Sequence, residues 1–369
     1  MKRYLLPIIL CVVLLSGCIS EYIPTGLDSV RGILVVDGAI TDGESVFALR
    51  RSVAMTDTLT GAETVDNATV FVETNDGERI PAEFRGSGIY AAQTGVLDVA
   101  KEYRLRMTVD GEDYVSGFLS PLITPPIDSI SFNKERLGDP VIVSVSTHDP
   151  DDISPYYRWT YRETWEVQAQ LYANARWGPD GSIIWHSLSS SENTYYCWGR
   201  DSSKMIFLAT ADKMRENVIS QQTLVEIPCS HDKLSILYHI EVTQMHIRTE
   251  AYEYFSDMQQ SVERTGDLFS PVLTTAIRGN IRCENDPERQ IIGYIEVATA
   301  TQMDRYFWEK DNLGIYEKVW ETCEEYSATN ETSAILTYPS LRAPLRCVDC
   351  RTKENAGKNK PQDWPTDHL

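Results

Sequence analysis

The amino-acid sequence predicts a mainly β protein, built from an N-terminal β-sandwich and a larger, mostly antiparallel β domain. Short runs of alternating apolar and polar residues follow one another along most of the chain, and Gly-containing turns separate several of them. Tyrosine, which favours sheet surfaces, is abundant with 19 residues, whereas clear helical spacing of apolar residues occurs in one segment. We therefore expect strands to dominate, accompanied by one amphipathic helix.

The first residues have the features of an export signal. Two basic residues precede a nearly continuous apolar run over residues 5–15, which is shorter than the roughly 20 residues that a membrane-spanning helix needs. The sequence Leu15-Ser16-Gly17-Cys18 resembles the lipobox of bacterial lipoproteins. We expect residues 1–17 to be a signal peptide, Cys18 to be lipidated and residues 18–31 to form a tether, with a plain secretory signal as the alternative.

Residues 32–120 are expected to form the first module. Its turns at Asn75-Asp76-Gly77 and Asp110-Gly111 place glycine where tight hairpins require positive φ. Many short strands in so short a segment predict a small β-sandwich of the immunoglobulin-like or transthyretin-like kind. The predicted strands are Ile33–Ile40, Ser45–Ser52, Ala68–Thr74, Arg79–Phe84, Ile89–Ala92, Glu102–Val109 and Asp113–Leu119.

A proline-rich joint, residues 121–126, is expected to separate this module stiffly from the second, which covers residues 127–369. The second module is also predicted to be mostly β, because apolar and polar residues alternate in several of its segments. Its one helix is expected at about residues 250–264, where apolar side chains recur at helical spacing. Thr249 is the predicted N-cap, and Gly266 follows the predicted end.

Six cysteines remain once the signal is removed and Cys18 is lipidated. In an exported protein this even number favours disulfides and a disulfide-braced C-terminal tail, although six cysteines allow 15 connectivities. We favour a pair between Cys197 and Cys229, because both flank predicted strands. Cys347-Val348-Asp349-Cys350 suits half a zinc site, a redox dithiol or two disulfide ends, and export favours the last. The disulfide candidates are Cys197, Cys229, Cys283, Cys323, Cys347 and Cys350.

Two groups of side chains are candidates for ligand contacts. The aromatic residues that we single out for a ligand or partner surface are Tyr157, Trp159, Tyr161 and Trp198, although a β core explains most such residues equally well. A weak calcium candidate consists of Asp149, Asp151 and Asp152, which are also typical of a turn before a strand.

The sequence predicts no catalytic residues, no cofactor and no further metal site. Ser230-His231-Asp232 contains the residue types of a catalytic triad, but adjacent side chains in an extended segment point in different directions. The net charge is −20, and losing Lys2 and Arg3 with the signal makes it −22. Such an acidic protein is not expected to bind nucleic acid, and we expect it to contact a membrane through its lipid anchor.

In the order of its motifs the chain resembles domain-of-unknown-function family 4249, lipoproteins of Bacteroidetes-type bacteria. It departs from the family pattern at residues 353–357, where a Gly-Gly pair is expected. The motifs that carry the resemblance are Cys18, Ile33–Gly38, Gly88–Tyr90, Tyr103–Leu105, Asp110–Gly111, Pro126–Ile130, Asp149–Pro150, Tyr156–Trp159, Glu250–Tyr254, Phe269–Pro271, Gly279–Ile281, Gly293–Tyr294, Cys347–Arg351, Pro361 and Trp364.

This resemblance implies an accessory role, because family members are usually described beside TonB-dependent outer-membrane transporters for carbohydrates or peptides. It assigns no activity and therefore no catalytic residue. We expect a lipid-anchored binding or assembly protein at the outer membrane, facing the cell surface; the periplasmic face is the alternative, since Cys18-Ile19-Ser20-Glu21 carries only one acidic residue. The alternative functions are a surface hydrolase of glycans or peptides and a structural envelope protein without a ligand. The sequence does not identify the ligand.

Overall fold

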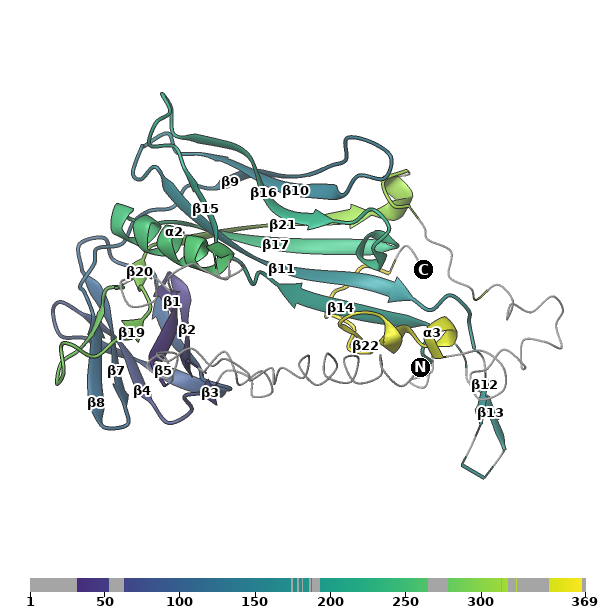
Figure 1. The fold of residues 1–369 in the computed structure, drawn as a ribbon, viewed down its shortest axis with the longest axis horizontal. Helices are drawn as coiled ribbons and strands as arrows, with labels where there is room; N and C mark the ends of the chain where they lie inside the picture. The colour runs from purple at the N-terminus through teal and green to yellow at the C-terminus, as the bar shows by residue number, and fades with distance from the viewer. Residues whose placement is uncertain are drawn as a thin grey trace, which may run out of the picture.

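A computed structural model describes residues 32–52, 63–264 apart from several positions between 174 and 192, 278–317 apart from residue 313, Cys323 and residues 345–366. The predicted signal peptide and Cys18 lie outside these residues. The described part consists of two β modules, with the N-terminal module at one end and the C-terminal tail at the other (Figure 1). No helix in these ranges combines the length and apolar character needed to cross a membrane.

The N-terminal module is built on an 11-stranded sheet that folds over on itself around one core. β5 joins the two halves, because it pairs with β4 on one side and with β6 on the other. Fully buried side chains such as Phe47, Leu49 and Leu105 fill the space between them. Its strands from the first part of the chain are β1 (Leu34–Ile40), β2 (Gly43–Arg51), β3 (Glu63–Thr64), β4 (Thr69–Thr74), β5 (Arg79–Gly86), β6 (Ile89–Gly95), β7 (Tyr103–Val109) and β8 (Glu112–Ser116).

Three short strands from much later in the chain complete this module. β18 (Ile281–Cys283) pairs with β8, while β19 (Ile291–Ile292) and β20 (Glu296–Val297) pair in parallel with β1. In Figure 1 the light green segments β19 and β20 lie beside the purple strand β1. The predicted boundary at residue 120 therefore describes only the first crossing between modules, because residues 281–297 return to the N-terminal sheet.

The second module packs two sheets face to face. A three-stranded sheet, in the order β16-β10-β9, covers one face of a six-stranded sheet whose main order is β21-β17-β11-β14-β22. One apolar cluster, which includes Val143, Trp159 and Ile240, lies between them. The strands are β9 (Ile127–Asn133), β10 (Val141–His148), β11 (Tyr156–Gln168), β14 (Tyr196–Ser202), β15 (Phe207–Thr210), β16 (Val218–Ile227), β17 (Leu237–His246), β21 (Ala300–Trp308) and β22 (Ala356–Gly357).

Smaller elements extend from this sandwich. A hairpin of β12 (Ala175–Trp177) and β13 (Ile183–Trp185) projects from the end that carries the C-terminal tail (Figure 1). The tail contains α3 (Leu345–Val348) and a 3₁₀ turn, η8 (Cys350–Thr352); two further 3₁₀ turns are η2 (Asp232–Leu234) and η4 (Glu309–Asp311). The mainly β class, the antiparallel sheets and the disulfide-braced tail agree with the sequence prediction.

The predicted helix is α2 (Thr249–Arg264), and it lies where the two modules meet. Its buried side chains Ala251, Tyr254 and Phe255 pack with Tyr294, which follows β19. The helix begins one residue earlier than predicted: the carbonyl of Arg248 accepts the hydrogen bond of the Tyr252 amide, so Arg248 precedes the first turn and Thr249 lies within it.

The joint between the modules is buried and hydrogen-bonded. Thr124 is 5% exposed, and its amide and hydroxyl bond to the hydroxyl and carbonyl of Thr299. The side chain of Arg248 bonds to the buried carboxylate of Glu296 and to the carbonyl of Ser120. These contacts connect the first crossing of the chain to the later ones, so the modules are joined by several segments and the joint is not a free hinge.

Candidate functional site

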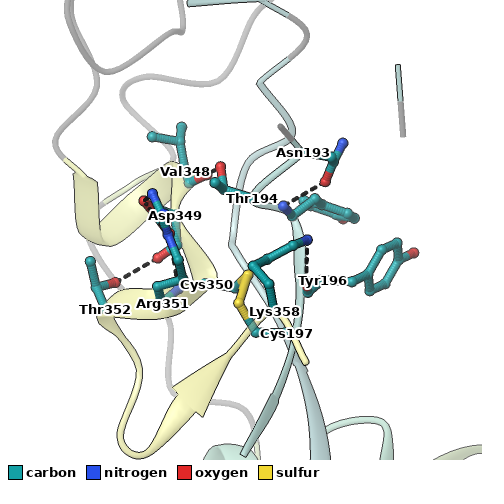
Figure 2. The surroundings of a disulfide bond; sticks show 11 residues. Asn193, Thr194, Tyr196, Cys197, Val348, Asp349, Cys350, Arg351, Thr352 and Lys358 are labelled. Carbon is teal, nitrogen blue, oxygen red and sulfur yellow. Dashed lines mark hydrogen bonds and ion pairs between the residues drawn. A yellow bond between two sulfur atoms is a disulfide. The ribbon is translucent and has the colours of Figure 1, made fainter. Parts of the chain in front are cut away.

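Two disulfides fix the C-terminal tail to the second module. Cys350 pairs with Cys197 of β14, with Cα atoms 5.6 Å apart (Figure 2). Cys347 pairs with Cys323. The two cysteines of the Cys-x-x-Cys motif thus end two separate disulfides. The favoured pair of Cys197 with Cys229 is wrong, because the tail brings Cys350 against β14 and Cys350 forms the disulfide with Cys197.

The two remaining cysteines do not form a disulfide. Cys229 and Cys283 are both buried and free. Cys229 follows β16 in the second module, whereas Cys283 lies in β18 of the N-terminal module. The even count therefore overestimated the number of disulfides, because β18 carries one cysteine into a different core.

The tail continues across the six-stranded sheet beyond the disulfide. β22 pairs with β14, and the Lys358 ammonium donates to the carbonyl of Tyr196 over 2.8 Å (Figure 2). Further along, Trp364 is 5% exposed, and its indole Nε1 donates to Glu166 over 2.7 Å. We call the face on which Trp364 lies the outer face; it is opposite the face that packs on β9, β10 and β16. The tail covers the end of the outer face farthest from the N-terminal module.

Two of the proposed ligand aromatics belong to the core. Tyr157 and Trp159 are fully buried, and their rings stack with centroids 5.6 Å apart. The Trp159 indole donates to Gln244 over 2.8 Å, and Gln244 in turn donates to the carbonyl of Pro125. Their prediction as ligand contacts is therefore wrong: on strand β11 they point toward the three-stranded sheet, and they support the joint instead.

The other two aromatic candidates lie in different places. Tyr161 is half-buried, and its ring contacts Phe207 at a centroid distance of 5.5 Å. Burial raises the pKa of Tyr161 to about 12. Trp198 lies on the outer face under the tail, where the ammonium of Lys360 stands 5.8 Å from its ring centroid. The four residues therefore do not form one aromatic surface.

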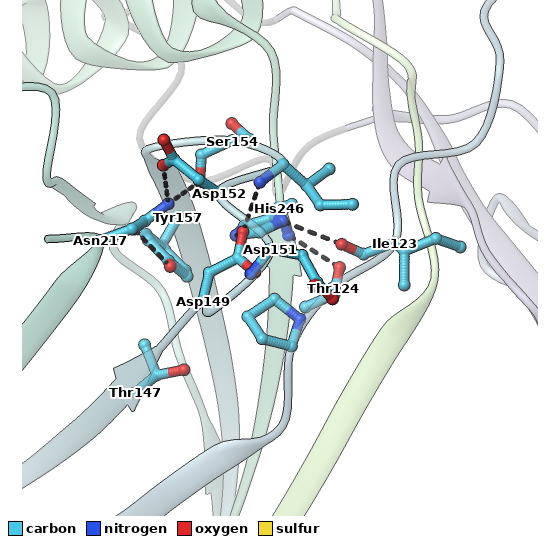
Figure 3. A network of polar contacts seen from close by, with 12 residues as sticks. Ile123, Thr124, Thr147, Asp149, Asp151, Asp152, Ser154, Tyr157, Asn217 and His246 are labelled. Atoms are coloured by element: carbon cyan, nitrogen blue, oxygen red, sulfur yellow. Dashed lines mark hydrogen bonds and ion pairs between the residues drawn. The ribbon is translucent and has the colours of Figure 1, made fainter.

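The aspartates of the calcium candidate build a turn instead of a common site (Figure 3). The carboxylate of Asp149 accepts the amides of Asp151 and Ile153, and Asp152 accepts a hydrogen bond from Asn217. These are local bonds of the kind that shape Asx turns. Among the described residues, no three His, Cys, Asp or Glu side chains are grouped so that they could hold a metal ion.

A buried histidine lies beside this turn (Figure 3). His246 is 0% exposed; its Nδ1 bonds to the carbonyl of Ile123, and its Nε2 lies 3.7 Å from Asp149. Burial lowers the pKa of His246, and the charge of Asp149 only partly opposes this effect. Neutral His246 thus connects the joint to the end of β17, which is a structural role.

The candidate functional site is a groove between the two modules. It has a volume of about 670 Å³, within the range of ligand pockets. The β1–β2 hairpin of the N-terminal module forms one wall, and the outer face of β11, β17 and β21 forms the other. The lining residues are Asp37, Gly38, Ala39, Thr41, Asp42, Glu44, Val46, Arg158, Thr160, Arg162, Thr243, Met245, Ala300 and Gln302.

Strand alternation explains why the sheet wall of this groove, which is also its floor, is polar. Residues of β11 with odd numbers, such as Trp159, enter the core, so Arg158, Thr160 and Arg162 line the outer face. In the paired register Thr160 lies opposite Thr243, which lies opposite Gln302 of β21. A row of hydroxyl and amide groups therefore crosses the three strands.

Arg158 is a charged group of the groove that the protein satisfies only in part. Its side chain is 17% exposed, and its guanidinium stands 4.3 Å from the ring centroid of Phe255 in α2. Its one ion pair is with Asp37 at 3.5 Å, and its buried Nε has no hydrogen-bond partner among the described residues. Because a guanidinium has five N–H donors, the terminal nitrogens of Arg158 keep donors for a ligand beside the one that Asp37 accepts.

A second hollow of about 570 Å³ extends the groove along the outer face. Arg162 lines both hollows, and the second also includes Arg200, His239 and Glu241. Between Arg158 and Thr164 the strand advances about 20 Å, at 3.3 Å per residue. We call the two hollows together the trough, a polar channel that runs from the N-terminal module to the tail.

The sequence did not single out the residues of the trough. Arg158 stands between Tyr157 and Trp159, and the ligand contacts predicted in this segment were aromatic residues only. The signal that pointed to the outer face was the set of polar residues between the aromatic ones. No sequence pattern indicated that β1 and β2 form the opposite wall.

The structure thus defines a two-module, mainly β protein with a polar groove at the junction of its modules. The chain belongs to the family described as "Domain of unknown function (DUF4249)", whose model matches residues 20–304. No curated protein matches the chain.

Two solved structures share the β architecture only loosely. A segment of two fibronectin type III domains from chicken tenascin is 12% identical; the alignment covers 58% of this chain and 90% of that one, with a TM-score of 0.18. The adhesin InvE of Yersinia pseudotuberculosis is 14% identical, with coverage of 57% and 54% and a TM-score of 0.16. Scores this low carry no argument about function.

Proposed function

We propose that this protein is a lipid-anchored binding protein of the bacterial outer membrane, which assists a TonB-dependent nutrient transporter through its trough. The observation that carries the proposal is the preformed groove between two rigidly joined modules, with Arg158 incompletely satisfied. A binding site needs groups that are fixed, because little conformational entropy is then lost on binding. It also needs groups that are unsatisfied, because these can form hydrogen bonds with a ligand. The lipobox-like sequence at Cys18 and the family resemblance supply the location and the partner.

The test of this proposal is a native pull-down from detergent-solubilised outer membrane. An affinity tag is inserted between Arg136 and Leu137, two exposed loop residues, so that the lipid anchor and the tail stay intact. A stoichiometric TonB-dependent transporter in the eluate is the expected result. A protein that elutes alone, together with normal nutrient uptake in a deletion strain, would contradict the accessory role.

Two matched variants connect the pull-down to its premises. Cys18→Ser removes the lipidation site, and we expect it to move the protein from the membrane fraction to the soluble fraction. Thr160→Trp fills the groove from an exposed position on β11 and leaves Arg158 in place. If the transporter no longer co-purifies with Thr160→Trp, the groove contains the contact with the partner. If co-purification is unchanged, the partner binds elsewhere and the groove is available to a small ligand.

A surface hydrolase is the second candidate, because two acidic residues, one of which lines the trough, adjoin on the outer face. Glu241 of β17 and Asp304 of β21 lie opposite each other on the outer face. Paired carboxylates are the catalytic groups of glycoside hydrolases. Each is, however, already bound to a cation or histidine, Glu241 to Arg162 and Asp304 to His239. Turnover of a glycan or peptide that Glu241→Gln abolishes would establish this alternative.

A further inference from the structure

The charges of the groove are divided between its two walls. The β1–β2 wall contributes only acidic charges, those of Asp37, Asp42 and Glu44, whereas the sheet wall contributes Arg158 and Arg162. A ligand that fits both walls must therefore present a hydrogen-bond acceptor to the sheet and a positive group to the hairpin.

The acidic wall is accessible and only partly neutralised. The side chain of Asp37 is 71% exposed, and its one ion pair within the described residues is the long contact with Arg158. Glu44 is 44% exposed and meets Arg85 at 3.5 Å and Gln93 at 2.7 Å. Asp42 is fixed in place by the amide of Ala300 over 2.8 Å. Together they create a negative potential at the mouth of the groove, next to donors at its floor.

The shape of the trough favours an extended chain. Its floor follows strand β11 for about 20 Å, the length of about six extended residues. At Thr160 this path crosses the row that Thr160 forms with Thr243 and Gln302, whose hydroxyl and amide groups can exchange hydrogen bonds with a backbone amide of the ligand. Val46 is 43% exposed in the groove and provides an apolar contact for the methylene stem of a long side chain.

The lining distinguishes this ligand from a glycan. None of the described residues that line the groove is aromatic. Sugar rings usually stack on aromatic side chains, and the tryptophans and tyrosines at the tail end of the outer face lie beneath or beside the tail. Peptide backbones need no such platform, because their amide groups satisfy paired donors and acceptors.

We propose that the groove binds an extended peptide that carries a basic side chain, with peptide oxygens on the donors of Arg158 and the basic group against Asp37 and Glu44. This inference rests on the proposed binding function and adds the chemical class of its ligand. Asp37 and Arg158 would then exchange their long mutual contact for two shorter contacts with the ligand, each charge-assisted.

Isothermal titration calorimetry with the full mature chain tests the inference. The probes are acetyl-Ala-Ala-Lys-Ala-Ala-amide, the same peptide with Glu in place of Lys, and maltohexaose. We expect the lysine peptide to bind at least tenfold more tightly than the glutamate peptide at low salt, with a smaller ratio at 1 M NaCl because salt screens the exposed acidic wall. Binding of maltohexaose alone, or no binding of either peptide at millimolar concentration, would overturn the inference.

Four variants locate the interaction. Arg158→Gln should weaken the binding of both peptides at least tenfold, because it removes charge-assisted hydrogen bonds to the peptide oxygens. Asp37→Asn should lower the preference for lysine over glutamate without abolishing binding. Arg136→Gln and Glu135→Gln remove matched charges from an exposed loop outside the groove. They should change neither the affinity for the peptides nor the preference for lysine. Equal effects of groove and loop variants would overturn the assignment of the site.

If Arg158→Gln does not fold, Thr160→Trp, which blocks the groove and keeps Arg158, gives the same test.

Two outcomes distinguish a failure of this inference from a failure of the proposed function. If the transporter co-purifies but no peptide binds, only the ligand class is wrong. If the lysine peptide binds but no transporter co-purifies, the accessory role is wrong and the peptide site remains.

Discussion

Removal of the disulfide between Cys197 and Cys350 should destabilise the second module more than removal of the one between Cys323 and Cys347. The two bonds make a matched pair, because both hold the tail and all four cysteines are fully buried. They differ in the length of chain that each one closes. The double variants Cys197→Ala/Cys350→Ala and Cys323→Ala/Cys347→Ala therefore isolate the effect of loop length.

The expected magnitudes follow from the sequence separations. A disulfide restricts the unfolded chain, and in the chain-entropy model its contribution grows with the logarithm of the loop. The separation is 153 residues for Cys197 and Cys350 and 24 for Cys323 and Cys347. The model then gives about 5.1 kcal/mol for the long loop and about 3.5 kcal/mol for the short one at 25 °C. The difference between the two variants should be about 1.6 kcal/mol.

Guanidinium unfolding followed by tryptophan fluorescence measures these free energies. The Cys283→Ala variant is the control, because this cysteine is free and lies in the N-terminal module. If the short-loop variant proved the less stable of the two, loop entropy could not be the dominant contribution. Equal stability with and without a reductant would show that neither bond forms in the purified protein.

Three further predictions concern single side chains. Trp364→Phe should cost about 1.5–3 kcal/mol in unfolding free energy, because it keeps most of the ring but removes the donor to a buried carboxylate. Gly199→Ala should lower the free energy of unfolding, measured by chemical denaturation, by about 1–3 kcal/mol. The reason is that a Cβ atom there would stand 2.2 Å from the ring of Trp165. The pKa of His246 is lowered in the folded protein, so the unfolded chain binds the proton more readily once the pH falls below the usual pKa of 6.5. His246→Asn removes this effect and should therefore reduce the loss of thermal stability between pH 7 and pH 5.

Each of these predictions has a matched control. Trp185→Phe changes a tryptophan that is 57% exposed and should alter stability by less than about 0.5 kcal/mol. Gly357→Ala is the control for Gly199→Ala and should not lower stability through a clash, because a Cβ atom at Gly357 of β22 meets nothing within 4 Å. His148→Asn should act oppositely to His246→Asn, because Asp128 raises the pKa of His148 and its contribution is present below pH 6.5 and lost as the pH rises. A pH profile that is identical in both histidine variants would contradict this assignment.

Local patterns were sufficient to predict the longer N-terminal strands, although the two-residue strand β3 had no predicted counterpart. The predicted segment Ile33–Ile40 became β1 (Leu34–Ile40), and Arg79–Phe84 lies within β5 (Arg79–Gly86). Alternation is a property of neighbouring residues, and a half-buried strand displays it directly. The helix was predictable for the same reason, because its apolar spacing lies within one segment.

The sequence patterns could not predict contacts between distant segments. β18, β19 and β20 are two or three residues long, too short to show a period, and their partners lie more than 150 residues away. The disulfide of Cys197 likewise depends on the path of the tail. Pairing of distant segments is decided by the summed burial of both cores, which no short window of sequence contains.

The trough shows the same division between sequence and tertiary structure. The sequence by itself determined that β11 has one aromatic and one polar face, because side chains alternate along a strand. Only the tertiary structure decided which face entered the core and what stands opposite the other. The aromatic face became the core because it buries more apolar surface, and the polar face then met the β1–β2 hairpin and became a groove.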